Sequence, residues 1–479
     1  MEFDLSKAHC FYFNEICQIP HCSNHEAELS NYLVDFAKKH NLKYWQDDLY
    51  NVIIYKDASQ GYESSDLLMI QAHIDMVCEK NKDVTHDFLK DPLKLYVEDG
   101  LLKAHGTTLG ADDGHGVAYM MAILADANLK HPALECVFTV QEEIGLLGAL
   151  HLKKENIKAR RMISLDGGGE TSTLVSSSGG CQNIVKKALK WQDNQADTYQ
   201  LAVTGLSGGH SGGEISKEKG NANKLLVRLL KEAELAGNKL NLVNLTGGLK
   251  DNAIPREAEA VFAAAASLET LKKSFQASSA AILEELEYSD PNFSFSLEKV
   301  ATASQVFSDE TSRQVIDLIF LLPNGFKHRS MKFLDLTITS LNLGIIRTTE
   351  QDLTLTISIR SALKSGIGNL INEIACLTEI FDASYQIQAY YPGWNFSEVS
   401  DLRDKLDGVI KELYPGQELE LIAAHGGSEC GVFKEMHPEM DIVLIGPITR
   451  YIHTPDEELD LASFDRTYQL LTTFISRLT

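Results

Sequence analysis

Five side chains of the kinds that bind metal ions occur in this chain, each after an apolar run or in a glycine-rich turn. Two imidazoles and three carboxylates are enough to hold two metal ions when one carboxylate bridges them. A spare carboxylate, Glu142, stands beside one of these ligands and could act as a base. The pattern therefore predicts a two-metal hydrolase. The five candidate ligands are His73, Asp112, Glu143, Asp166 and His453.

The first candidate ligand, His73, ends the apolar segment DLLMIQAH, which predicts a buried strand. In open parallel sheets, ligands bind beyond the carboxyl ends of the strands. Asp75 follows two residues later and points to the same side of an extended backbone. It could accept the second ring N–H of His73 and so fix the tautomer that a metal-binding histidine needs. A core histidine at a strand end is the alternative when this segment is taken alone.

The glycine-rich segment GTTLGADDGHG holds two adjacent acids, Asp112 and Asp113, and a carboxylate there could bridge two ions. An Asp-Gly turn with helix-capping acids is an equally common use of such a segment. His115 is a rival ligand two residues on, but we expect a side chain in the first helical turn after the glycine to face elsewhere.

Adjacent acids also follow a later predicted strand, where Glu142 and Glu143 end the segment ALECVFTVQEE. One of them could bind a metal ion while the other moves protons, because a metal ion lowers the pKa of water toward about 7. Two solvated acids before a helix are the alternative. Asp166 follows the strand segment RMISL, and His453 follows the strand segment MDIVLIG. Nitrogen and oxygen ligands without thiolate favour Zn²⁺, with Mn²⁺ or Co²⁺ as alternatives.

The elements that must position these residues alternate between strand and helix in the first part of the chain. Such alternation implies an α/β fold with a mostly parallel sheet that helices cover on both faces. A helix is also predicted over 25–40, with Ser23 or Asn24 as its N-cap. The predicted strands are 51–56, 66–75, 133–141 and 161–166, and the further helices are 116–126 and 146–154.

The pattern changes after about Cys181, where strands and helices fit an α+β insert with an antiparallel sheet. Two halves of this insert share a similar order and predict a weak repeat, whose second half begins with the strand 293–300. The α/β pattern then returns, as it must if His453 is to reach ligands that precede residue 170. One domain interrupted by another is therefore predicted, with boundaries 1–182 for the first part of the outer domain, 183–392 for the insert and 393–479 for the second part of the outer domain.

Composition narrows the classes of function. The formal net charge of -23 argues against nucleic acid or an anionic membrane as a partner. No apolar run reaches the roughly 18 residues that span a bilayer. The acidic N-terminus lacks a basic region followed by an apolar stretch, so we expect no signal peptide and a cytoplasmic location. The eight cysteines form no CxxC pair and are expected to be mostly buried small hydrophobes, with Cys430 in a glycine-rich turn as the exception.

Seven segments together resemble a known family, the co-catalytic metallopeptidases that include carboxypeptidase G, aminoacylase, succinyl-diaminopimelate desuccinylase and tripeptidase T. Within it, the motifs are most similar to those of the bacterial aminoacyl-histidine dipeptidases, which split Xaa-His dipeptides. The resemblance runs nearly end to end and includes motifs between the candidate ligands. The segments are HIDMV, GTTLGADDG, EEIGLLGA, GLSGGHSGGEI, DNAIPREA, HGGSECG and IHTPDE.

The resemblance implies a role for each candidate ligand. Asp112 would bridge two Zn²⁺ ions per subunit and would be followed by a cis peptide bond. His73 and Asp166 would complete one ion site, and Glu143 and His453 the other. Glu142 would be the general base and then the general acid, and Asp75 would orient His73.

The resemblance also implies a peptide-binding lid and a homodimer. His210, Asn252 and Arg360 are similar to lid residues that hold substrate carbonyl and carboxylate groups, and Gly427 and Glu429 would line the substrate end near the metals. The implied activity is hydrolysis of Xaa-His dipeptides, β-alanyl-histidine among them. Rival activities are those of a tripeptidase, a broad-specificity dipeptidase or an N-acyl amino-acid deacylase. A non-catalytic metal-binding protein is a rival of another class, and the intact ligand set with Glu142 argues against it.

Overall fold

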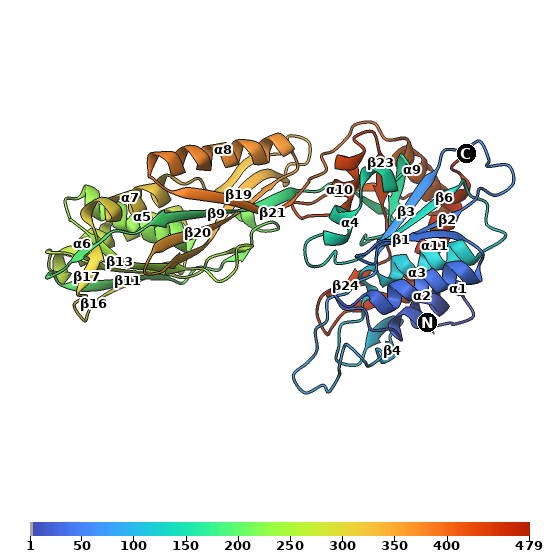
Figure 1. Ribbon diagram of the computed structural model, residues 1–479, viewed down its shortest axis with the longest axis horizontal. Coiled ribbons are helices and arrows are strands. Elements are labelled where there is room, and N and C mark those ends of the chain that lie inside the picture. The colour runs from blue at the N-terminus through green and yellow to red at the C-terminus, as the bar shows by residue number, and fades with distance from the viewer. Residues whose placement is uncertain (1–2) are drawn as a thin grey trace. The chain divides into compact units, whose positions relative to one another are not determined.

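The computed structural model describes residues 3–479, which form two compact units (Figure 1). The first unit consists of three segments of the chain and the second of two, so the second interrupts the first in sequence. In the part of the chain described, no helix is both long enough and apolar enough to cross a membrane. The segments are Met1–Ser177, Trp394–Ala423 and Ser428–Thr479 for the first unit, and Ser178–Gly393 and Ala424–Gly427 for the second.

A six-stranded sheet forms the centre of the first unit, in the order β1-β2-β6-β3-β7-β23. The last four strands of this order run parallel, whereas the β1–β2 and β2–β6 pairs are antiparallel. Every residue of β3, β6 and β7 is buried, as expected for strands covered on both faces. The predicted α/β fold is confirmed. The strands are β1 (Lys43–Gln46), β2 (Val52–Lys56), β3 (Leu68–His73), β6 (Leu134–Thr139), β7 (Arg161–Ser164) and β23 (Asp441–Leu444).

The helices of the first unit pack through apolar faces onto this sheet and each other. α3 is apolar on almost all sides, and it contacts α1, α11 and β3 within one hydrophobic core. The hydroxyl of Tyr119 on α3 donates to the carbonyl of Phe464 on α11 at 2.6 Å. The helices are α1 (Ala8–Cys17), α2 (Ala27–Lys39), α3 (Ala111–Ala125), α4 (Leu147–His151), the 3₁₀ helix η1 (Lys154–Asn156), α9 (Asp401–Leu413), α10 (Glu429–Met436) and α11 (Leu461–Ser476).

A second, four-stranded sheet joins distant parts of the chain in the first unit, in the order β24-β25-β5-β4. β24 and β25 form a hairpin around the loop 451–457, and β25 pairs antiparallel with β5. The chain leaving β5 leads into α3, so this sheet brings the His453 loop beside the segment that carries Asp112. Its strands are β4 (Leu95–Glu98), β5 (Leu101–Ala104), β24 (Thr449–Arg450) and β25 (Glu458–Asp460), and a separate parallel pair consists of β8 (Ser172–Ser176) and β22 (Glu420–Ala423).

The second unit is built on a nine-stranded antiparallel sheet in the order β16-β11-β15-β13-β19-β20-β9-β21, with β18 on β19. Figure 1 labels several of its strands, among them β9, β19, β20 and β21. The main strands are β9 (Gly179–Ala188), β11 (Thr198–Thr204), β13 (Asn241–Gly247), β15 (Ala258–Ala263), β16 (Ser294–Val300), β18 (Gly325–Arg329), β19 (Thr337–Thr348), β20 (Asp352–Ser361) and β21 (Ser384–Tyr391). The helices are α5 (Ala222–Leu235), α6 (Leu268–Glu285), α7 (Asp309–Leu321), α8 (Lys364–Ile380) and the 3₁₀ helix η2 (Ile215–Lys217). Two short pairs are β10 (Trp191–Asp193) with β17 (Gln305–Phe307), and β12 (Gly209–His210) with β14 (Ala253–Ile254).

The two halves of this sheet repeat one topology. The first half follows the order β11-α5-β13-β15-α6-β16, and the second follows β9-α7-β19-β20-α8-β21. In each half the first strand lies between the third and the fourth, and the halves meet where β13 pairs with β19. The sequence prediction of a repeat is therefore right, but its boundary was wrong. β16 closes the first half instead of opening the second, because β9 supplies the second half's first strand.

The predicted N-cap of the helix over 25–40 was also wrong. α2 begins at Ala27 with Glu26 as N-cap, and the hydroxyl of Ser23 instead donates to the Asp75 carboxylate at 2.7 Å. The prediction that the cysteines are mostly buried small hydrophobes is confirmed, because five of the eight are free and buried. Cys22 and Cys78 are exceptions that the sequence did not predict, since they form a disulfide with a Cα–Cα distance of 5.8 Å. Their 56-residue separation hides this pairing from sequence spacing.

Candidate metal centre

The carboxylate of Asp112 lies between two histidines from distant parts of the chain. Its Oδ1 is 3.2 Å from Nε2 of His73, and its Oδ2 is 3.2 Å from Nε2 of His453. His73 is the last residue of β3, and His453 lies in the loop between β24 and β25. The peptide bond between Asp112 and Asp113 is cis, as the resemblance implied. One carboxylate therefore offers a separate oxygen to each of two imidazoles.

Two further acids complete the surroundings of these histidines. Asp166, just beyond β7, has an oxygen within 4.8 Å of ligand atoms of His73 and Asp112. Glu143 lies just beyond β6, and its Oε1 is 2.9 Å from Nε2 of His453. A carboxylate oxygen of Glu143 also lies within 4.8 Å of one of Asp112. The parallel strands β3, β6 and β7 end at the same edge of the sheet, which is why their following residues converge.

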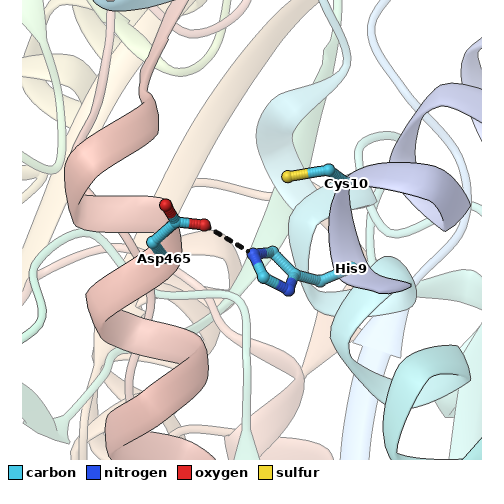
Figure 2. Close-up of side chains that lie close together, drawn as sticks. All are labelled: His9, Cys10 and Asp465. Carbon is cyan, nitrogen blue, oxygen red and sulfur yellow. Dashed lines mark hydrogen bonds and ion pairs between the residues drawn. The ribbon is translucent and has the colours of Figure 1, made fainter. Parts of the chain in front are cut away.

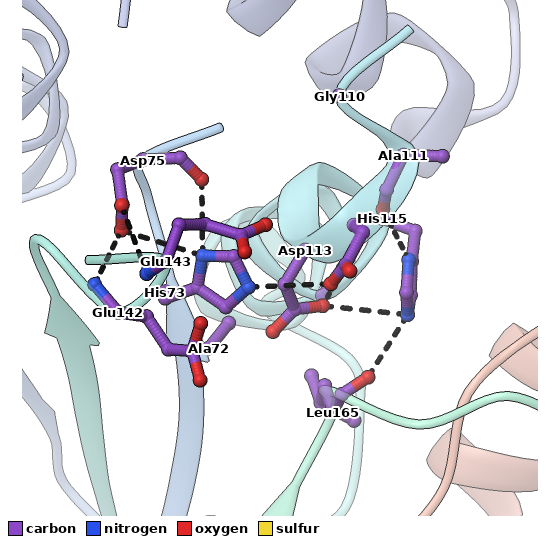
Figure 3. Close-up of polar contacts among 12 residues, drawn as sticks. Ala72, His73, Asp75, Gly110, Ala111, Asp113, His115, Glu142, Glu143 and Leu165 are labelled. Atoms are coloured by element: carbon purple, nitrogen blue, oxygen red, sulfur yellow. Dashed lines mark hydrogen bonds and ion pairs between the residues drawn. The ribbon is translucent and has the colours of Figure 1, made fainter. Parts of the chain in front are cut away.

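Asp75 ties the His73 strand to the loop that carries Glu142 and Glu143 (Figure 3). Its carboxylate accepts the backbone N–H groups of Glu142 at 2.9 Å and Glu143 at 3.3 Å. Nδ1 of His73 lies 3.0 Å from the Asp75 carbonyl oxygen and 3.4 Å from its carboxylate Oδ1. Asp75 can thus fix the tautomer of His73 through either oxygen, with Nε2 left free toward Asp112.

The rival residues of the Asp-Asp-Gly-His segment have other partners (Figure 3). Asp113 is fully buried, and its Oδ1 accepts the backbone N–H of Gly116 at 3.2 Å. The ring of His115 contacts the carbonyl oxygens of Ala111 and, at 2.9 Å, Leu165. Contact with two backbone carbonyls leaves this imidazole no free nitrogen for a metal.

Burial and neighbouring charges shift the pKa values of the ionisable groups in this cluster. Hydrogen bonds to Asp112 and Glu143 raise the pKa of His453 to about 10. Burial alone would raise the pKa of Asp112, but its hydrogen bonds from His453 and His73 outweigh burial and lower it. Burial raises the pKa of Asp166 well above its usual range. Since buried carboxylates require a compensating charge, this donor set suits bound cations.

Glu142 differs from its neighbour in its surroundings. Burial raises the pKa of its carboxyl to about 8, with the charges of Glu429 and Glu143 adding to the rise. Its side chain belongs to a group with His73 and Glu143 in which ligand-type atoms lie within 4.8 Å. A carboxyl group with a raised pKa beside a cation site can accept a proton and release it again near neutral pH.

Glu429 lies inside the first unit, where its side chain is buried. Its Oε2 accepts hydrogen bonds from Gln71 on β3 and Thr139 on β6, both at 2.6 Å. Burial raises the pKa of Glu429 to about 7.

Cys430 follows Glu429 in the helix α10. Burial raises the pKa of its thiol to about 12, so this thiol stays protonated. Cys430 is therefore an inert core residue, unlike the exception that the sequence suggested.

The remaining sequence-predicted residues belong to the second unit. His210 pairs with Ala253 in the β12–β14 ladder, which brings it beside Asn252, whose carbonyl accepts the N–H of Ser211 at 2.8 Å. Arg360 is buried near the end of β20, and its Nη1 donates to the Tyr391 hydroxyl at 3.2 Å.

Gly427 and an unpredicted histidine lie close to this arginine. A Cβ atom on Gly427 would lie 2.9 Å from the Tyr391 ring, so only glycine fits there without a shift. His425 is buried, with Nε2 2.7 Å from the Ser340 hydroxyl. Burial, with Arg360 and His210 nearby, lowers the pKa of His425 to about 3. Sequence reasoning missed His425, although its place at the start of HGGSECG was a usable signal.

A second group of ligand-type side chains in the first unit has a structural explanation (Figure 2). Nε2 of His9 lies 2.8 Å from Oδ1 of Asp465, and the ammonium of Lys7 pairs with the other carboxylate oxygen. Burial raises the pKa of the Cys10 thiol to about 12. The His9 ring stacks on Tyr468 with centroids 4.5 Å apart. A neutralised carboxylate and a protonated thiol do not suit a metal ion.

Comparisons with known proteins agree with the motifs. Residues 69–477 match the model of "Peptidase family M20/M25/M40". The chain is 36% identical over 476 residues to the cytosol non-specific dipeptidase of Escherichia coli (strain K12), covering 97% of this chain and 96% of that protein. Its structure is similar to that of aminoacylhistidine dipeptidase from Vibrio alginolyticus, with a TM-score of 0.91, 33% identity and coverage of 98% and 96%. The family resemblance predicted from the sequence is confirmed.

Proposed function

The chain belongs to peptidase family M20/M25/M40, and on that premise we propose that it is a two-metal dipeptidase that hydrolyses Xaa-His dipeptides, β-alanyl-histidine among them. The two-metal site is proposed because the two oxygens of the Asp112 carboxylate each lie 3.2 Å from a different imidazole. The substrate class rests on the V. alginolyticus relative, named an aminoacylhistidine dipeptidase.

The proposed metal ligands fall into two overlapping groups. His73, Asp112 and Asp166 form one group, and Asp112, Glu143 and His453 form the other, each with ligand atoms within 4.8 Å of one another. Asp112 belongs to both and is the proposed bridge. The donors are nitrogen and oxygen without thiolate, which favours two Zn²⁺ ions per subunit, with Mn²⁺ or Co²⁺ as alternatives.

Two such ions would act as Lewis acids that polarise a substrate carbonyl and acidify water. Glu142 is the proposed general base, which takes a proton from the attacking water and returns it to the leaving amine. Its backbone N–H is held by Asp75, so the loop that carries it is fixed to the His73 strand. Asp75 is accordingly a positioning residue for both His73 and Glu142.

Four residues of the second unit and one of the first are the proposed contacts to substrate. Arg360 suits a planar substrate carboxylate because a guanidinium can donate two parallel hydrogen bonds. His210 and Asn252 would hold carbonyl groups of the substrate. Gly427 and Glu429, which flank the start of α10, would line the substrate end.

Replacing Arg360 with alanine should lower kcat/KM for a dipeptide by about 10- to 100-fold, because a hydrogen bond to a charged group contributes about 1.5–3 kcal/mol. The same dipeptide with an amidated C-terminus should be cleaved poorly by wild type and no worse by Arg360→Ala. Steady-state rates on both substrates measure this. An equal fractional loss on both substrates would show that Arg360 does not bind the carboxylate.

A broad-specificity dipeptidase is the second candidate, because the E. coli relative is named a non-specific dipeptidase. A panel of β-alanyl-histidine, alanyl-histidine, alanyl-leucine, a tripeptide ending in histidine and N-acetyl-histidine separates the possibilities. Preference for the two histidine dipeptides supports the proposal. Equal cleavage of alanyl-leucine would favour the broad dipeptidase, and preference for the tripeptide or the acetyl compound would favour a tripeptidase or deacylase.

Two further properties complete the proposal. A cytoplasmic location is supported by the name of the E. coli relative, a cytosol dipeptidase. A homodimer is supported by the family resemblance and by the frequency of two-fold assemblies among soluble enzymes. Light scattering on the purified protein should give twice the mass of one chain. The mass of a single chain would reject the dimer and leave the proposed activity untouched.

A further inference from the structure

Glu457 is a buried acid to which the proposed mechanism gives no role. It lies four residues after His453, in the loop between β24 and β25, and only 2% of its surface is exposed. Its carboxylate faces the segment that leads into Asp112, 345 residues away in the chain. Glu457 ends the HTPDE segment, and the sequence predicted no role for it.

The carboxylate of Glu457 accepts the backbone N–H groups of four successive residues. Oε2 accepts from Leu109 at 2.8 Å and Gly110 at 3.0 Å, and Oε1 accepts from Ala111 at 2.9 Å and Asp112 at 3.4 Å. Successive N–H groups that converge in this way form a concave binding site for an anion. The anion here is a side chain of the protein itself.

The segment around Asp112 lacks a cap of its own. The residue before α3 is Gly110, which has no side chain to accept the first N–H groups and adopts a left-handed φ of 67°. Asp112 and Asp113 have non-helical backbone angles within the first turn. A charged acceptor is the strong form of such a hydrogen bond, so Glu457 replaces the missing cap.

The same residue is fixed to the His453 loop. The N–H of Glu457 donates to the carbonyl of Thr454 at 3.1 Å, and the hydroxyl of Thr454 donates to the carbonyl of Tyr451 at 2.7 Å. Glu457 therefore joins the backbone that carries Asp112 to the loop that carries His453. These two side chains lie 3.2 Å apart at the proposed shared ion.

We propose that Glu457 is a positioning residue that holds the bridging Asp112 and His453 in register for the metal ion they share. The inference rests on the proposed function, since it needs a metal at this site. Residues that orient metal ligands typically affect metal affinity by about 10- to 100-fold. A merely structural Glu457 would affect the stability of the fold and leave the metal affinity of the folded protein unchanged.

The chain offers a matched control in Glu135, at the opposite end of β6 from Glu143. Glu135 is also fully buried, and its carboxylate accepts the backbone N–H groups of Lys158 and Ala159 at 3.0–3.2 Å. Glu135→Gln and Glu457→Gln both place an amide against backbone N–H donors. Glu135 has no place in the ligand groups, so its replacement reports the effect of losing a buried carboxylate alone.

The test is Zn²⁺ affinity, measured on metal-free full-length protein by competition with a chromophoric chelator, with circular dichroism to confirm folding. We expect Glu457→Gln to bind at least one Zn²⁺ about 10- to 100-fold more weakly than wild type, and Glu135→Gln to bind like wild type. Equal affinities for all three proteins would overturn the inference. Absence of Zn²⁺ binding by wild type would instead reject the proposed function.

A second variant covers the case in which Glu457→Gln does not fold. Glu457→Asp keeps the charge but withdraws it by one methylene, so fewer of the four N–H groups can be reached. We expect it to fold and to bind Zn²⁺ with an affinity below that of wild type. Wild-type affinity in folded Glu457→Asp, with Glu457→Gln unfolded, would assign Glu457 a structural role and overturn the inference.

Discussion

Replacement of Glu142 by glutamine is expected to lower kcat for dipeptide hydrolysis by about 10²- to 10⁴-fold, the range that a positioned general base contributes. The amide keeps the size of the side chain but cannot accept the proton of the attacking water. The ligand groups of Asp112 are complete without Glu142, so bound metal should stay at the wild-type level. Steady-state kinetics with elemental analysis of the same preparation measure both quantities.

The exposed Glu155 in η1 supplies the control, since Glu155→Gln removes a similar charge from the surface of the same unit. That variant should match wild type in rate and metal content. Two results would count against the role of Glu142. Retention of substantial activity would remove it as the base, and loss of metal together with activity would make it a ligand.

Replacement of Asp112 by asparagine should have the other large effect, because one side chain serves both proposed ion sites. Asparagine keeps the shape but removes the charge that faces His73 and His453. Metal affinity should fall by more than the roughly 10- to 100-fold that follows loss of an outer-shell partner, and activity should fall with it. Zn²⁺ titration of the metal-free variant measures the loss.

Asp113→Asn is the matched comparison, and it decides between the two acids that the sequence left open. Asparagine at 113 retains the side-chain oxygen that accepts the Gly116 N–H, so the fold should be kept. We expect Asp113→Asn to bind two Zn²⁺ ions per chain. Normal metal binding by Asp112→Asn, with loss in Asp113→Asn, would move the bridge to Asp113.

The sequence predicted well where one rule linked position in the chain to position in space. His73 ends an apolar strand, the Glu142–Glu143 pair and Asp166 follow two others, and parallel strands end at one edge of a sheet. The alternation of strand and helix along the chain was enough to predict a parallel sheet, without knowledge of the order of its strands. It was enough to place four of the candidate side chains at one edge of the first unit's sheet.

His453 and Glu457 could not be placed in that way. Their loop is held by β24 and β25, strands of two and three residues that are too short to show any periodicity. The loop reaches Asp112 only because β25 pairs with β5, a strand that lies far from β25 in the sequence. The Cys22–Cys78 disulfide likewise joins segments whose proximity only the folded chain reveals.

The sequence could indicate that α3 needs a capping group, but not that Glu457 supplies it. A helix that starts after Gly110 lacks a side-chain cap, and this predicts that some other group must accept its first N–H groups. Nothing in the sequence indicates which of the chain's many acids does so. Identifying it required the pairing of β25 with β5.

The measurement that tests the central claim most directly is hydrolysis of β-alanyl-histidine by the purified protein, before chelation, after chelation and after return of Zn²⁺. We expect activity to vanish in the metal-free protein and to recover in proportion to bound Zn²⁺, up to two ions per chain. Undiminished hydrolysis by protein shown to be free of metal would contradict the account. So would failure of the protein with two bound Zn²⁺ ions to cleave β-alanyl-histidine or any other dipeptide.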